Sequence, residues 1–184
     1  MPTLYFMRHG ETEANVTGIL TGTIETRLTE KGRADAKAVG ESLQMKFDRY
    51  YCSPLTRTHE TLAAVRGNVP FVIDKRLIEV CSGDWQGQLK SELPKAEYEA
   101  YVRGELTPPN GESLEKVTAR ARDFVTEMFD GRFGKDEKIL VVTHNAFMRQ
   151  LKRLFLDPSE VKIPKNLEVF ELTEDMMKKA GLLK

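Results

Sequence analysis

The chain has 184 residues, which is the size of one domain with room for an insertion. Hydrophobic residues make up 40% of the sequence and charged residues 30%, a globular composition that excludes a disordered or membrane-embedded chain. The 28 basic and 28 acidic residues cancel, so the sequence lacks the net positive charge typical of nucleic-acid-binding domains, and any anion site must be local.

The first part of the chain alternates expected strands with expected helices. Residues 3–7 (TLYFM) form a short apolar run that predicts a buried strand. Residues 49–52 (RYYC) and 70–73 (PFVI) predict two shorter strands. Residues 29–43 begin with threonine and glutamate, an N-cap and a first-turn carboxylate, and residues 53–65 begin with a Ser-Pro pair. Both beginnings predict helices.

The alternation continues after an irregular stretch. Residues 81–112 have no clean period and contain one short expected helix near Tyr98. Residues 113–129 carry apolar side chains at three- and four-residue steps, which predicts an amphipathic helix. A second buried strand is expected over residues 138–143 (KILVVT), followed by a helix over residues 145–156 that stops before Asp-Pro.

The end of the chain completes the predicted fold. Residues 166–173 (NLEVFELT) alternate polar and apolar side chains, as in an edge strand with one solvated face. Residues 174–184 are polar and predict no element. Strands alternating with helices imply a parallel sheet covered on both faces. We therefore expect an α/β fold, a three-layer αβα sandwich with a mostly parallel central sheet, as a single domain over residues 1–184 with an irregular excursion at about 81–112.

The cysteine count and the first residues predict the compartment. The two cysteines, Cys52 and Cys81, are in no close-spaced motif, which argues against a disulfide or zinc framework and for a reducing compartment. The longest early apolar run, residues 4–7, is far below the roughly 7 to 15 residues of a signal-peptide core or the roughly 18 of a membrane span. We expect a cytoplasmic protein.

Five residues of catalytic chemistry follow the expected parallel strands. They are Arg8, His9, Arg57, Glu79 and His144. Ligands of open parallel sheets bind outside the carboxyl ends of the strands, so we expect these side chains to meet at one edge of the sheet.

The residue types favour phosphoryl transfer. Arginine binds phosphate oxygens bidentately and keeps its charge, so Arg8 and Arg57 suit a tetrahedral dianion, and Arg57 also lies near a helix N-terminus. A neutral imidazole can attack phosphorus, which makes His9 the candidate nucleophile. A protonated or hydrogen-bond-donating His144 can offset charge on the phosphoryl oxygens without a metal, and Glu79 is free to protonate the leaving oxygen.

The motifs around these residues resemble one known family. They are RHGET at 8–12, GTIETRLTEKG at 22–32, CSPLTRTHET at 52–61, LIEVCSGDWQGQ at 77–88, PPNGES at 108–113 and VVTHNA at 141–146. Together, from residue 3 to about residue 156, they resemble the histidine phosphatase superfamily in its phosphoglycerate mutase-like branch. The resemblance implies a phosphoglycerate mutase-like fold.

The resemblance also implies a role for each site residue. His9 would carry the phosphoryl group as a phosphohistidine, and Glu79 would act as general acid and then as general base. Phosphate contacts are implied from Arg8, Arg57 and His144, with secondary contacts from Asn15 and Thr23. No metal and no cofactor are implied.

Within this family the sequence favours a phosphatase over a mutase. Mutases resemble one another in an arginine directly after the acid and in an insertion with paired arginines. Here Val80 follows Glu79, and Arg103 stands alone. Lys90 stands where a mutase also carries a lysine, so a cofactor-dependent phosphoglycerate mutase that binds an acid through Lys90 is the alternative.

His59 and three further glutamates also have to be assigned a role. His59 lies about 200° around the helix from Arg57 and should point elsewhere, in a structural role. Glu11, Glu105 and Glu112 could compete with Glu79 for the acid role, and only their positions relative to the motifs argue against them.

The sequence also bears on three other classes of protein. A metal-dependent hydrolase and a P-loop enzyme are disfavoured, because neither an HExxH motif nor GxxxxGK[ST] is present. A non-catalytic phospholigand-binding module stays open, because a fold does not fix a function. The expected partner is a small-molecule phosphate ester, with no nucleic acid and no membrane. Sugar phosphates, phosphoglycerates, nucleotide-related phosphates and phosphopeptides are all compatible, and the sequence predicts no oligomeric state.

Overall fold

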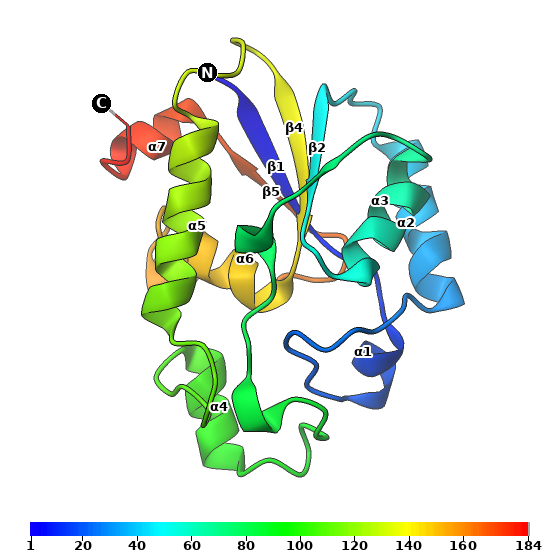
Figure 1. The fold of residues 1–184 in the computed structure, drawn as a ribbon, viewed down its shortest axis with the longest axis vertical. Coiled ribbons are helices and arrows are strands. Elements are labelled where there is room, and N and C mark those ends of the chain that lie inside the picture. The colour runs from blue at the N-terminus through cyan, green and yellow to red at the C-terminus, as the bar shows by residue number, and fades with distance from the viewer. Residues whose placement is uncertain (184) are drawn as a thin grey trace.

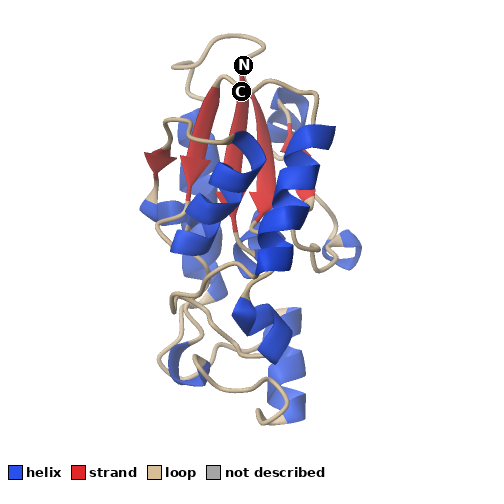
Figure 2. Cartoon of the chain, turned by 90° about the vertical axis from the view of Figure 1, so that its right-hand side faces the viewer, coloured by secondary structure: helices blue, strands red, loops and turns tan. Residues whose placement is uncertain are grey.

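The computed structural model, which describes residues 1–183, has a central sheet between two layers of helices (Figures 1 and 2). Within these residues the sheet has five strands in the order β3-β2-β4-β1-β5. The strands are β1 (Thr3–Arg8), β2 (Arg49–Cys52), β3 (Val72–Ile73), β4 (Lys138–Thr143) and β5 (Val169–Leu172). The prediction of an α/β, three-layer fold is confirmed.

The helices alternate with these strands. They are α1 (Glu13–Thr17), α2 (Glu30–Ser42), α3 (Thr56–Arg66), α4 (Lys95–Arg103), α5 (Leu114–Met128), α6 (Asn145–Lys152) and α7 (Glu174–Lys179). The predicted N-cap of α2 is confirmed, because the hydroxyl of Thr29 accepts from the Gly32 N–H. The hydroxyl of Ser113 accepts from the Lys116 N–H and caps α5.

The pairing of the strands brings their carboxyl ends together. β4 pairs in parallel with β1 and with β2, and β2 pairs in parallel with β3. β5 lies at the sheet edge, as predicted for the last strand, and it runs antiparallel to β1. In the β1–β4 pair, Arg8 lies opposite Thr143. The carboxyl ends of the parallel strands therefore face the end of the molecule that carries α1 and α4 (Figure 1).

Alternation along β1 divides the core into two halves, because successive side chains of a strand point to opposite faces. Leu4 and Phe6 are fully buried in a cluster with residues of α5, α6 and α7. Tyr5 and Met7 lie in a second cluster with residues of α2 and α3. The sheet is thus covered on both faces, which fixes the strands whose ends carry the site.

The loop after β1 is held in place by a close backbone approach. The backbone of Gly32, in the first turn of α2, lies so close to Glu11 that a Cβ on it would be 2.2 Å from the Glu11 carbonyl oxygen. On the other side of the loop, the Gly10 N–H donates to the Thr61 hydroxyl at 2.9 Å. Only glycine allows α2 to pack this tightly, so the sequence around residue 32 positions the loop that follows β1.

The start of α3 differs from the prediction. The helix was expected from residue 53, with Ser53 as N-cap, but it begins at Thr56 and its N-cap, Leu55, makes no side-chain cap bond. Ser53 is completely buried, and its hydroxyl bonds the ring of His144 and accepts from the Leu55 N–H. The N-cap predicted from the Ser-Pro pair is therefore wrong, because Ser53 makes a tertiary hydrogen bond with His144.

Two further boundaries differ. α6 ends at Lys152 rather than residue 156, because the next N–H groups, of Leu154 and Phe155, bond to carbonyls three residues back and tighten the chain into a turn. β5 begins at Val169 rather than residue 166, because Leu167 has a φ of 64°, which no strand residue adopts.

The irregular excursion forms its own small cluster. It contains α4, the helix predicted near Tyr98, and packs Trp85, Leu93 and Tyr101 against one another. The hydroxyls of Ser82 and Tyr101 lie 2.8 Å apart. Figure 1 shows this segment beyond the carboxyl ends of the strands, so it forms one wall of the region where the site lies.

The C-terminal residues also belong to the core. The sequence predicted no element beyond residue 173, but α7 follows its N-cap Thr173 and buries Met177 completely. None of the helices in residues 1–183 is both long enough and apolar enough to cross a membrane.

Candidate active site

The two central parallel strands place two histidines side by side. His9 directly follows β1 and His144 directly follows β4, and the His9 N–H donates to the Thr143 carbonyl at 3.0 Å. The centroids of the two imidazole rings are 5.3 Å apart. The predicted meeting of these residues at one sheet edge follows from the parallel register of β1 and β4.

The ring of His9 is held in one tautomer. Its Nδ1 lies 2.7 Å from the Gly10 carbonyl oxygen. A carbonyl oxygen only accepts, so Nδ1 carries the proton and Nε2 keeps its lone pair. His9 is 5% exposed and lines a cavity at the sheet edge. An unprotonated Nε2 facing a cavity is the form of imidazole that can act as a nucleophile.

Arg57 connects the second histidine to the loop after α1. Its Nε donates to the His144 Nδ1 at 3.2 Å, and its two terminal nitrogens donate to the carbonyls of Ile24 at 2.9 Å and Gly22 at 2.8 Å. The side chain is almost completely buried. A guanidinium has five N–H groups, so two are left for a ligand in the cavity that Arg57 lines.

His144 is also neutral and tautomerically fixed. Because Arg57 donates to Nδ1, the ring proton lies on Nε2, which donates to the Ser53 hydroxyl at 2.7 Å. The sequence predicted a protonated or donor His144 facing the phosphoryl group. In the structure its N–H is directed to Ser53 and its ring does not line the cavity.

Burial lowers the basicity of both rings. The pKa of His9 is held well below its usual 6.5, first by burial and then by the charges of Arg57 and Arg8. The pKa of His144 is lowered in the same way, by burial and then by Arg57. Both imidazoles are therefore neutral at neutral pH.

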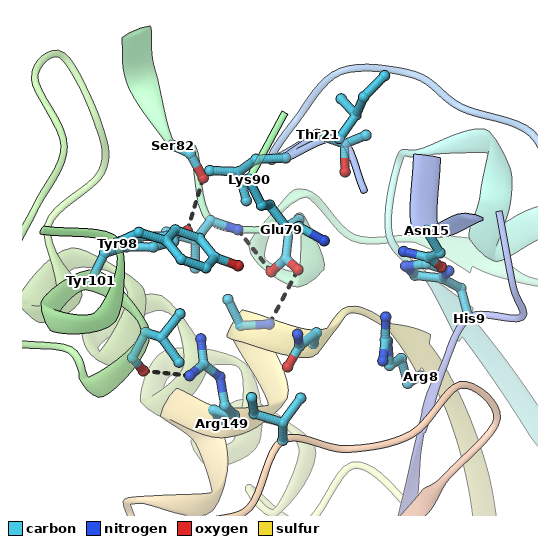
Figure 3. A pocket seen from close by; sticks show the side chains of 18 of the residues that line it. Arg8, His9, Asn15, Thr21, Glu79, Ser82, Lys90, Tyr98, Tyr101 and Arg149 are labelled. Carbon is cyan, nitrogen blue, oxygen red and sulfur yellow. Dashed lines mark hydrogen bonds between the residues drawn. The ribbon is translucent and has the colours of Figure 1, made fainter. Parts of the chain in front are cut away.

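Glu79 is fixed by backbone donors. Its Oε1 accepts from the N–H groups of Val80 at 2.9 Å and Phe147 at 3.0 Å, and its Oε2 accepts from the Ala146 N–H at 3.1 Å. Two of these donors belong to the first turn of α6, where free N–H groups favour a carboxylate. The bonds hold the carboxyl group at the cavity wall, and in Figure 3 it lies between Tyr98 and His9.

The cavity is more positive than the chain as a whole. The charged residues that line it are the cations Arg8, Arg57, Lys90 and Arg149 and the carboxylate Glu79. Arg8 donates one N–H to the Pro164 carbonyl at 2.7 Å and keeps a buried Nε that has no partner among residues 1–183. An excess of cations in a neutral chain indicates a site for an anionic ligand.

The three further binding residues predicted from the sequence do not all line the cavity. Asn15 and Lys90 line the cavity. Thr23 does not, because both its N–H and its hydroxyl donate to Gln86 Oε1, at 2.8 and 3.0 Å. The structure therefore brings two of the three residues to the cavity and leaves Thr23 in the wall behind it.

The competing carboxylates are bound elsewhere. Glu11 accepts from the Thr29 hydroxyl at 2.9 Å. Glu105 pairs with Arg103 and Glu112 with Arg120. Glu79 is therefore the carboxylate of the described residues that lines the cavity together with His9.

The cavity is also lined by Arg149 and Asn145, which the sequence did not single out, and by Tyr98. A signal was present for one pair, because Asn145 and Arg149 are four residues apart on one helix and so share a face. Tyr98 lies on α4 in the excursion, whose path no sequence pattern predicted.

Comparison with known proteins agrees with this geometry. A family model described as the histidine phosphatase superfamily, branch 1, matches residues 4–173. The adenosylcobalamin/alpha-ribazole phosphatase of Salmonella typhimurium is 34% identical over 156 residues, which cover 80% of this chain and 76% of that protein. The 2,3-bisphosphoglycerate-dependent phosphoglycerate mutase of Bartonella quintana is 30% identical, over 81% of this chain and 79% of that protein.

Solved structures give the same result. A mycobacterial glucosyl-3-phosphoglycerate phosphatase, in a complex with VO3, superposes with a TM-score of 0.82 at 28% identity. The superposition covers 93% of this chain and 92% of that one. The relatives thus include phosphatases and mutases, all matched over most of their length.

Proposed function

The chain belongs to the histidine phosphatase superfamily, branch 1, and from this premise we propose that it is a metal-independent phosphomonoesterase that forms a phosphohistidine at His9. The whole chain acts as one catalytic domain. Its substrate is a small phosphate ester, because the cations of the site line one pocket rather than an extended surface.

The observation that carries the proposal is the state of His9. Its Nδ1–H donates to the Gly10 carbonyl, and its unprotonated Nε2 faces a cavity that Arg8 and Arg57 also line. A neutral nucleophile beside two fixed guanidinium groups is what attack on a phosphate dianion needs.

In the first step the Nε2 lone pair of His9 attacks phosphorus and the ester P–O bond breaks. The leaving oxygen takes a proton from the carboxylic acid form of Glu79 and departs as an alcohol. Arg8 and the two free N–H groups of Arg57 offset the charge on the equatorial oxygens. The Gly10 carbonyl accepts from Nδ1 throughout, so it also stabilises the positive charge that develops on the ring.

In the second step a water molecule attacks the phosphoryl group. The Glu79 carboxylate takes the proton of the water, and the N–P bond breaks to regenerate neutral His9 and release inorganic phosphate. A mutase would follow the same first step but return the phosphoryl group to a second hydroxyl. The relatives of both kinds, together with Lys90 in the cavity, keep the mutase as second candidate.

The test is phosphate release from 4-nitrophenyl phosphate with a chelator present, followed by rapid quenching with labelled substrate. Wild type should release phosphate and yield an acid-labile, alkali-stable label on the protein, as phosphohistidine does. His9→Asn should lose both, while the control His59→Asn keeps both, because His59 lies outside the cavity.

Each contrary outcome would favour a different function. Activity lost to the chelator would contradict metal independence. Phosphoglycerate interconversion that needs a phosphorylated primer, without net phosphate release, would favour the mutase. Binding of phosphate without label or turnover would favour the non-catalytic module.

We place this reaction in the cytoplasm. Cys52 and Cys81 are both free thiols, as expected in a reducing compartment. Recovery of the activity from a membrane or extracellular fraction of the source cells would contradict this placement.

A further inference from the structure

The segment that carries Glu79 belongs to no strand or helix. Residues 78–82 lie between two short 3₁₀ helices, Lys75–Leu77 and Gly83–Trp85. Backbone carbonyls outside a regular element take their hydrogen bonds from side chains, from other loops or from water. The position of the Glu79 carboxyl group therefore depends on the groups that bond the backbone on either side of it.

Arg120 of α5 supplies three of these bonds. One of its terminal nitrogens donates to the carbonyls of Arg76 at 2.5 Å and Ile78 at 2.7 Å, and the other donates to the Glu79 carbonyl at 3.4 Å. The guanidinium also lies over the ring of Phe147, 5.2 Å from its centroid. Because the Phe147 N–H donates to the Glu79 carboxylate, Arg120 contacts both the segment and a residue that orients the carboxyl group.

Glu112 holds Arg120 in this orientation. Its two carboxylate oxygens accept from the Nε and from one terminal nitrogen of Arg120, at 2.8 and 2.9 Å, and both side chains are mostly buried. The Glu112 N–H also donates to the Cys81 carbonyl at 2.8 Å. The pair therefore fixes the backbone both before and after Glu79.

The sequence pattern of α5 is consistent with a functional role for this arginine. Arg120 lies three residues after Val117 and four before Phe124, which are both completely buried, so it shares the apolar face of the helix. A charged side chain on that face breaks the amphipathic pattern, and such exceptions are expected at residues that support a functional site. Its partner Glu112 belongs to the motif at 108–113, to which the proposed chemistry gives no role.

We propose that Glu112 and Arg120 are a positioning pair for Glu79, which holds the carboxyl group where it protonates the leaving oxygen of the substrate. Neither residue lines the cavity, so the pair acts through the backbone rather than on the substrate. This inference rests on the proposed function, in which Glu79 is the general acid, and deepens it by naming the residues on which that acid depends. A displacement of about 1 Å at a catalytic group can cost about a hundredfold in rate.

Two phosphate esters with different leaving groups test the inference. 4-Nitrophenolate departs readily without a proton, whereas the alkoxide of benzyl phosphate needs a proton from a general acid. Since kcat/KM covers the steps up to the departure of the alcohol, the ratio of kcat/KM, benzyl over 4-nitrophenyl, reports on the acid. Glu79→Gln removes the acid and sets the lowest ratio. We expect Arg120→Met and Glu112→Gln each to lower the ratio by about tenfold or more.

Arg76→Met is the matched control. Arg76 also stacks on a phenylalanine ring, that of Phe124. Its side chain pairs with three carboxylates, those of Asp74, Asp123 and Glu127. These carboxylates lie outside residues 77–82, so the variant removes ion pairs of the same kind without removing the bonds around the acid. It should keep the wild-type ratio.

A merely structural role for the pair would lower kcat/KM equally for both esters. Equal loss in Arg120→Met and Glu112→Gln, with a lowered ratio in Glu79→Gln, would overturn this inference and leave the proposed function intact. An unchanged ratio in Glu79→Gln would contradict the acid role and overturn both. Glu112→Gln carries the test if Arg120→Met does not fold, because it replaces one carboxylate oxygen with an amide nitrogen and leaves the N–H that bonds Cys81 in place.

Discussion

The Nε2 atom of His144 lies 2.7 Å from the hydroxyl of Ser53, and both side chains are completely buried. The bond holds the ring proton on Nε2 and leaves Nδ1 as an acceptor for the Arg57 Nε. Ser53 is thus a positioning residue, which acts on a guanidinium of the site through a histidine.

Ser53→Ala should remove the hydrogen bond that fixes the tautomer of His144. The buried N–H of His144 would lose its acceptor, at a cost of about 1–3 kcal/mol in the free energy of unfolding. The ring could then adopt the other tautomer, which turns Nδ1 into a donor toward Arg57. We expect kcat to fall more than KM rises, and 15N NMR of the imidazole to show mixed tautomers. A single Nε2–H tautomer in the variant would contradict the role.

The free energy of unfolding should depend on pH through the buried histidines. The pKa of His9 and that of His144 are lowered in the folded state, so below pH 6.5 the unfolded chain binds protons that the folded chain does not. Stability from these rings is complete above pH 6.5 and is lost as the pH falls. Urea unfolding at pH 7.5, 6.5 and 5.5 measures the slope. His9→Asn should reduce it, and an unchanged slope would contradict the buried neutral ring.

Much of the fold and most of the site could be predicted from local sequence. The runs TLYFM and KILVVT predicted strands whose parallel register brings His9 and His144 together, and the N-cap Thr29 predicted the start of α2. These features depend on a few adjacent residues, which is why pattern and capping chemistry sufficed.

What sequence could not predict depends on contacts between distant segments. Ser53 has the local signature of an N-cap but bonds a ring 91 positions away. Thr23 has the right place in a motif but bonds Gln86 in the excursion. Arg149 enters the cavity only because α4 and its neighbours fold over α6. Neither periodicity nor motif spacing encodes such packing.

An anion in the cavity should stabilise the fold, because the site binds it and the unfolded chain does not. Phosphate or orthovanadate at 100 times its Kd should add about 2.7 kcal/mol to the free energy of unfolding. Arg8→Met should weaken phosphate binding about tenfold to a hundredfold, since a hydrogen bond to a charged group is worth about 1.5–3 kcal/mol. Arg27→Met, at an exposed arginine outside the cavity, is the control. The shift of the melting temperature with phosphate concentration measures the binding and the stabilisation. Equal shifts in Arg8→Met and Arg27→Met would exclude Arg8 from the site.

The short C-terminal helix should contribute to stability despite its polar sequence. Met177 of α7 is completely buried in the cluster that contains Leu4 and Phe6, so Met177→Ala removes apolar contacts from the main core. Such truncations cost about 2–5 kcal/mol. Lys179→Ala, on the exposed side of the same helix, should change stability by less than about 0.5 kcal/mol. If urea unfolding gave the two variants equal midpoints, the packing of α7 against the core would not contribute to the free energy of unfolding.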